Sequence, residues 1–109
     1  MSRKSWRLVL SAAAEADLAN IAAWTAETFG VRQADVYVDA LLDCVEELAA
    51  NPFIERSRPR DEIAPGLRSL HMTKPRRRGR HFILYRAEDD VLTIVRILHD
   101  SMEMTRHLP

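Results

Sequence analysis

The sequence predicts an α+β fold in the order β-α-α-β-β-β-α, with a helical hairpin packed on an antiparallel sheet and a short C-terminal helix. Residues 12–50 carry apolar side chains at helical spacing on both sides of Gly30. Residues 67–99 hold three apolar runs separated by short links, as in a strand meander. A length of 109 residues, with 47% apolar and 29% charged residues, is typical of one globular domain, here 1–109.

The first half of the chain predicts one short strand and two helices. Weak alternation indicates a strand at Trp6–Leu10. Ser11 supplies an N-cap oxygen for a helix that ends at Gly30, a residue suited to a positive φ. A second helix is expected from about Val31 to Ala50, and Asn51-Pro52 ends it. The tight connection at Gly30 predicts that the two helices pack antiparallel.

The second half predicts a loop and then three strands. Residues 53–66 are expected to form the loop. Strands are expected at Leu67–Thr73, His81–Arg86 and Val91–His99, and the last is apolar enough to be central. A short helix from Met102 to Leu108 should end the chain.

The charge is zero overall but uneven along the chain. Residues 53–80 hold nine Lys and Arg against three acids, whereas residues 1–52 hold four against eight. The densest part is a basic loop that contains Lys74, Arg76, Arg77, Arg78 and Arg80. This density favours a polyanion or an acidic protein surface as partner, and a solvated hairpin tip explains it equally well.

Arg96 is unusual because it lies within the predicted central strand. A charged side chain there must find a partner or reach an open cleft. Strand alternation places it with Leu92, Ile94 and Leu98, and on the opposite face from His99 unless a bulge intervenes. His99 fits either a general acid or base or, more commonly, a residue that hydrogen-bonds the following turn.

Several function classes are disfavoured. Cys44 is the one cysteine and no histidine pair has metal-ligand spacing, so we expect no metal and no cofactor. Cys44 itself is expected to be a small buried residue. The chain has no serine–histidine–aspartate triad or glycine-rich phosphate loop. No apolar run reaches the ~18 residues of a membrane span and no signal peptide is visible, so a cytoplasmic protein without membrane contact is expected.

Several motifs, spread from Trp6 to Leu108, resemble the ParE toxins of the RelE/ParE superfamily. They are Leu10-Ser11-x-x-Ala14-x-x-Asp17-Leu18-x-x-Ile21, Leu48-Ala49-x-Asn51-Pro52, Arg60-Asp61-Glu62-x-x-Pro65-Gly66-Leu67-Arg68-Ser69, Ile83-Leu84-Tyr85-Arg86 and Arg96-Ile97-Leu98-His99-Asp100-Ser101-Met102-Glu103 followed by Arg106-His107-Leu108. This resemblance implies a compact RelE-like fold.

The resemblance also implies a function. ParE proteins are toxins of type II toxin–antitoxin pairs, and their usual target is DNA gyrase, whose cleaved-DNA state they poison by binding. A ParD-like antitoxin, usually a ribbon-helix-helix protein, neutralises them in heterotetramers or larger assemblies. The residues expected to bind the target are Arg96, His99, Met102, Arg106 and His107. Those expected to bind the antitoxin are Trp24, Arg68 and Tyr85.

Two alternatives remain open. The first is a RelE-like, ribosome-dependent mRNA endoribonuclease, in which His99, Arg96 and His107 would be catalytic. The second is an inactive chain that only binds an antitoxin. In the ParE interpretation, the basic loop is hypothesised to contact the acidic antitoxin tail or the gyrase–DNA complex.

Overall fold

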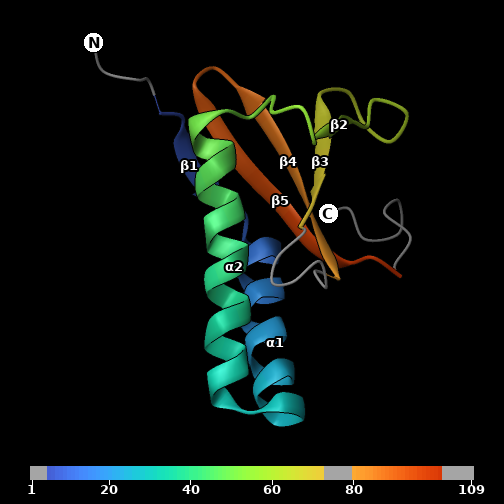
Figure 1. Cartoon of the computed structure of the whole chain (residues 1–109). Helices are drawn as coiled ribbons and strands as arrows, with labels where there is room; N and C mark the ends of the chain where they lie inside the picture. Colours follow the sequence, from blue (N-terminus) through green and yellow to red (C-terminus); the bar gives the residue numbers. More distant parts are fainter. Residues whose placement is uncertain (1–4, 73–79, 102–109) are drawn as a thin grey trace.

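The structure, a computed structural model, describes residues 5–72 and 80–101 (Figure 1). The elements in this part are β1 (Arg7–Leu10), α1 (Ala12–Phe29), α2 (Val31–Ala50), β2 (Arg58–Pro59), β3 (Leu67–His71), β4 (His81–Glu88) and β5 (Val91–His99). The sheet order is β1-β5-β4-β3-β2, so β5 and β4 are central. The predicted α+β fold, with a helical hairpin on a sheet, is confirmed.

The helical hairpin has the predicted bounds because its caps are well defined. The Ser11 hydroxyl oxygen accepts the N–H of Ala14 at 2.9 Å and donates to the carbonyl of Val95 at 2.7 Å. The cap therefore starts α1 and ties it to β5. Gly30 separates the helices at φ +97°, a backbone conformation that side chains disfavour. Among the described residues, no helix is long and apolar enough to cross a membrane.

The sheet differs from the prediction at its two edges. β1 pairs with β5 in parallel, so the sheet is antiparallel only from β5 to β2. Two helices and three strands separate β1 from β5, and this long connection permits parallel pairing, which a tight turn would exclude. At the other edge, Arg58 and Pro59 form a short strand within the predicted loop. The C-terminal helix predicted at Met102–Leu108 lies outside the described residues.

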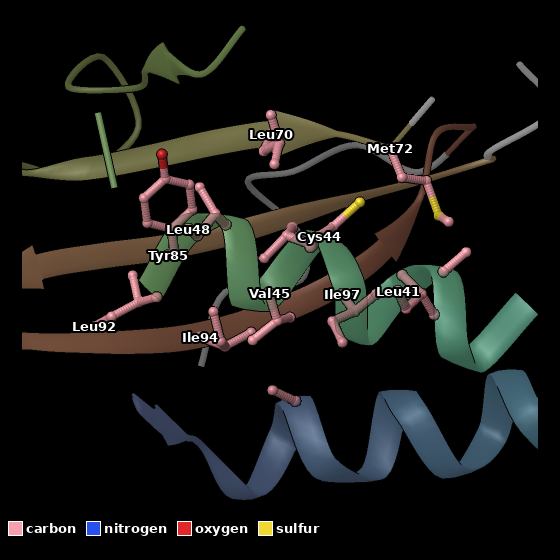
Figure 2. Packing of buried hydrophobic residues seen from close by; sticks show 13 residues of the cluster. Leu41, Cys44, Val45, Leu48, Leu70, Met72, Tyr85, Leu92, Ile94 and Ile97 are labelled. Atoms are coloured by element: carbon pink, nitrogen blue, oxygen red, sulfur yellow. The ribbon is translucent and has the colours of Figure 1, made fainter. Parts of the chain in front are cut away.

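Two apolar clusters lie on opposite faces of the sheet. The larger is between α2 and the sheet, where Leu41, Cys44, Val45 and Leu48 of α2 face Leu70, Ile83, Tyr85, Leu92, Ile94 and Ile97 (Figure 2). Cys44 is buried, as predicted. The smaller cluster, on the face that carries no helix, contains Leu67, Phe82, Leu84, Val95 and Leu98, with Ile63 and Ala64 packed against it. We call this second face the helix-free face.

A bulge in β5 changes which face each side chain occupies. Ile94 pairs with Tyr85 and Arg96 pairs with Leu84, so Val95 is an extra residue. Beyond it, Ile97 joins Ile94 on the helix side, and Arg96 lies across from Leu84 on the helix-free face. The predicted grouping of Arg96 with Leu92 and Ile94 is therefore wrong. The predicted separation of Arg96 from His99 holds, because His99 pairs with His81, three residues from Leu84.

Candidate functional site

Arg96 finds its partner on α1. Its Nε and one terminal nitrogen each donate to the Asp17 carboxylate at 2.7 Å, and the same carboxylate accepts the backbone N–H of Ile97 at 2.9 Å. β1 ends at Leu10, opposite Ile94, so this part of β5 has no strand on the β1 side, and Asp17 accepts the Ile97 N–H there. The hydrogen bonds to Asp17 raise the pKa of Arg96 above its usual value. Arg96 is thus held in a structural ion pair.

A polar cluster lies where β3 and β5 end and β4 begins. The Tyr37 hydroxyl of α2 accepts the N–H of Arg80 at 3.1 Å and lies 2.6 Å from Nδ1 of His81. Burial, with a smaller contribution from nearby His99, lowers the pKa of His81 to about 4. His81 is therefore neutral at pH 7, and its Nδ1 accepts a hydrogen bond from the Tyr37 hydroxyl. Burial also raises the pKa of Tyr37, which keeps the phenol protonated.

The exposed half of this cluster contains two histidines around one carboxylate. Nε2 of His71 is 3.3 Å from one oxygen of Asp100, and Nδ1 of His99 is 3.6 Å from the other. Nδ1 of His99 also accepts the backbone N–H of Ser101 at 3.2 Å. His99 therefore hydrogen-bonds the turn that follows β5. His71, which the sequence did not single out, lies beside it because the cross-strand register brings β3 next to β4 and β4 next to β5.

The helix-free face also carries a basic pocket, formed by Arg56, Arg58, Arg60, Ser69, His71 and Phe82. Its volume of about 90 Å³ exceeds the ~10–15 Å³ that one water molecule needs. Arg60 Nε donates to the buried Ser69 hydroxyl at 2.8 Å. The alternation Arg56-x-Arg58-x-Arg60 could have revealed this pocket, since alternate residues of an extended chain point the same way. Because residues 53–66 were expected to form a loop, this alternation was not recognised as the pattern of an extended segment.

The three residues expected to bind the antitoxin have different surroundings. Tyr85 is fully buried and its hydroxyl donates to the carbonyl of Pro52, so it offers no surface to a partner and that expectation is wrong. Arg68 is half-buried, donates to the Ser57 hydroxyl at 2.7 Å and stacks on Phe53, with its guanidinium carbon 5.2 Å from the ring centroid. Its contacts tie the 53–66 segment to β3. Trp24 alone is well exposed.

Trp24 belongs to an apolar patch at the turn of the helical hairpin. Its ring contacts Phe29 edge-on, with centroids 5.8 Å apart. Trp24, Phe29 and Val31 are 60%, 62% and 70% exposed. We call these three residues the hairpin-tip patch. The turn projects beyond the sheet (Figure 1), so residues of the sheet cannot cover it. Large apolar side chains this exposed indicate a protein-binding surface.

Other predicted site residues lie outside the described part of the chain. These are Lys74, Arg76, Arg77 and Arg78 of the basic loop and Met102, Arg106 and His107 of the C-terminal segment. Arg80, the last residue of the basic loop, is exposed, and its N–H is bound by Tyr37. Within residues 5–72 and 80–101, no group of three or more His, Cys, Asp or Glu side chains could hold a metal ion.

Comparison with solved structures supports the fold. The toxin–antitoxin structure described as the chromosomal ParDE system from P. aeruginosa contains a chain that superposes with a TM-score of 0.74. The sequences are 23% identical, and the match covers 90% of this chain and 98% of that one. The RelBE2 toxin–antitoxin complex from Mycobacterium tuberculosis gives a TM-score of 0.59 at 19% identity, over 87% and 98% of the two chains. At these identities both comparisons show the fold alone.

Comparison of sequences goes further. A family model described as the ParE toxin of the type II toxin–antitoxin system parDE matches residues 8–104. Toxin ParE1 of Mycobacterium tuberculosis is 38% identical over 105 residues, which cover 95% of this chain and 99% of that protein. Toxin ParE1 of Caulobacter vibrioides is 32% identical over 99 residues, 91% and 94% of the two chains. The chain belongs to the ParE family of type II toxin–antitoxin toxins.

Proposed function

We propose that this toxin inhibits DNA gyrase by stabilising the complex in which gyrase has cleaved DNA, and that a ParD-like antitoxin neutralises it in the cytoplasm. Membership of the ParE family supports the proposal, because the match covers residues 8–104 and so includes nearly all of the described fold. The toxin acts by binding and performs no chemical step itself.

The state of Arg96 is the observation that favours binding over catalysis. In the ribonuclease alternative, Arg96 and His99 act together on one phosphodiester. Here the guanidinium of Arg96 makes two 2.7 Å contacts with Asp17, and Arg96 and His99 occupy opposite faces of β5. A guanidinium that is already neutralised gains little by meeting a second anion. The pair required for that chemistry is therefore not assembled.

The hairpin-tip patch is the proposed contact for the antitoxin. An amphipathic antitoxin segment would cover Trp24, Phe29 and Val31 with apolar side chains. Replacing Trp24 by Ser should weaken antitoxin binding by at least about tenfold, since buried tryptophans dominate such interfaces. Leu42→Ser is the matched control, because Leu42 is also an exposed apolar residue (41%) but lies outside the patch. Equal affinities for the wild-type chain and Trp24→Ser, measured by calorimetry, would remove the patch from the interface.

Ribosome-dependent mRNA cleavage is the second candidate. It is favoured by one observation, that Asp100 lies between His71 and His99 at the exposed ends of β3 and β5. A histidine that contacts a carboxylate can serve as a general acid or base. Replacing His71 by Gln would abolish cleavage if this candidate were correct. It would leave gyrase inhibition unchanged if it were not, because His71 is not among the residues expected to bind the target.

Two parallel assays of the purified chain, freed from antitoxin, decide between the candidates. The first measures plasmid supercoiling by gyrase, and the second measures mRNA cleavage in a translation reaction. The proposal expects loss of supercoiling that the ParD-like antitoxin restores, with intact mRNA. Folded, growth-arresting toxin that leaves gyrase unaffected and cleaves mRNA would overturn it.

A further inference from the structure

We propose that the basic pocket on the helix-free face binds a backbone phosphate of a nucleic acid, with Arg58 as the main contact. Arg58 lies opposite Ser69 in the β2–β3 register, so its side chain is on the same face as Ser69, Leu84 and Arg96 across the sheet. This inference does not depend on gyrase being the target, because it concerns direct contact between the toxin and nucleic acid.

The charges around the pocket explain why Arg58 is the main contact. Arg56 makes two 3.3 Å hydrogen bonds to Glu47, which raise its pKa and satisfy its charge. Arg60 is held by Ser69 and lies 3.7 Å from Glu62. Arg58 is exposed, and no acid pairs with it within residues 5–72 and 80–101. Among the described residues, no acid compensates the charge of Arg58. The guanidinium groups of Arg56 and Arg60, in contrast, are already oriented by their hydrogen bonds.

The shape of the donor set favours phosphate over a carboxylate. A carboxylate is planar and is matched by the two parallel donors of one guanidinium, as Glu47 is by Arg56. In the pocket, Arg58 and Arg60 belong to β2 and the residue after it, and His71 belongs to β3, so the donors line the hollow from two neighbouring strands. A tetrahedral phosphate can accept from several directions at once, and guanidinium groups suit it. Phe82, 6% exposed, lines the same hollow.

The pocket is separate from the proposed antitoxin contact. β2 lies at the opposite end of the molecule from the hairpin turn that carries Trp24 and Phe29 (Figure 1). A protein partner can therefore cover the hairpin-tip patch without filling the pocket. This separation lets the two proposals be tested with different variants.

The test is binding of the full-length chain to fluorescein-labelled single strands of DNA and of RNA with the same sequence, followed by anisotropy at several salt concentrations. Arg58→Ser should weaken binding by about tenfold, as expected for loss of one charge-assisted contact. The slope of log affinity against log salt should fall by about one. Arg58→Lys should keep the slope and recover part of the affinity, since it keeps the charge but not the fork of donors.

Arg32→Ser is the matched control, because Arg32 is an exposed arginine on α2 outside the pocket. It should leave the affinity for both strands unchanged. A loss seen only with DNA, or only with RNA, supports the pocket and identifies the source of the phosphate. Equal binding by wild-type and Arg58→Ser chains, or an equal loss in Arg32→Ser, would overturn the proposal. The proposal would also be overturned if a labelled oligoglutamate peptide bound as tightly as DNA and RNA, and if Arg58→Ser weakened its binding to the same extent.

Discussion

The ion pair between Asp17 and Arg96 should be one of the largest single contributions to stability. Asp17→Ala removes two charge-assisted hydrogen bonds to Arg96 and the acceptor of the Ile97 N–H. The guanidinium of Arg96 would then lose its Asp17 counter-ion, and the Ile97 N–H would lose its acceptor. Both consequences destabilise the folded chain and leave the unfolded chain unaffected.

The size of the effect follows from the burial of the pair. Breaking a fully buried ion pair costs about 3–5 kcal/mol. The Arg96 and Asp17 side chains retain 20% and 13% exposure, so water screens part of the remaining charge. We therefore expect Asp17→Ala to lower the free energy of unfolding by about 2–4 kcal/mol. Arg96→Ala should cost somewhat less, because Asp17 still accepts the Ile97 N–H.

A double-mutant cycle measured by urea unfolding separates the pair from its surroundings. The coupling energy between Asp17→Ala and Arg96→Ala should be at least about 1.5 kcal/mol. Glu27→Ala is the control, since it removes an exposed acid from α1 without touching β5. It should change stability by less than about 0.5 kcal/mol. A coupling energy near zero, with unchanged slopes in urea, would refute the structural role assigned to Arg96.

Three further predictions concern other parts of the fold. The pKa of His81 is about 4 in the folded chain and near 6.5 when unfolded, so its contribution to stability is complete above pH 6.5 and is lost as the pH falls towards 4. Solvent screening limits the contribution of His81 to stability to about 1–2 kcal/mol. Thermal unfolding measured between about pH 4 and pH 6.5 should therefore show a weaker pH dependence for His81→Asn than for wild type. Tyr85→Phe should cost about 1–2 kcal/mol, because it leaves the Pro52 carbonyl without its donor, and should not change antitoxin affinity. A loss of antitoxin affinity in Tyr85→Phe would show that Tyr85 contributes to the interface. Gly30→Ala should cost at least about 1 kcal/mol from backbone strain alone, since no atom lies within 4 Å of the added Cβ; an unchanged melting temperature would contradict this.

The helices and the central strands could be predicted from sequence because their signals are local. The Ser11 cap, Gly30 and the apolar spacing of α2 depend on residues within a few positions of one another. The runs of β4 and β5 are apolar on both faces, which marks buried strands. The parallel pairing of β1 could not be predicted, because nothing in a short strand specifies its neighbour.

The sites were harder to predict because they depend on register. One extra residue, Val95, changes the face of every later side chain in β5, and no sequence pattern marked it. The requirement that Arg96 find a partner was correct, but Asp17 is 79 residues away and only the fold brings the two together. Tyr85 was mistaken for a surface residue because tyrosine occurs both in interfaces and in cores. The contact between His71 and Asp100 depends on the pairing of β3 with β4 and of β4 with β5, and the sequence did not specify the register of either pair.

The central claim is that this toxin poisons gyrase by binding, and the most direct measurement is the amount of linear plasmid DNA trapped on gyrase. The reaction contains gyrase, plasmid, ATP and the purified chain, and is stopped with detergent and protease. The account predicts linear DNA that increases with toxin concentration and disappears when the antitoxin is added first. Toxin that is folded and arrests growth, yet traps no linear DNA at any concentration, would contradict it.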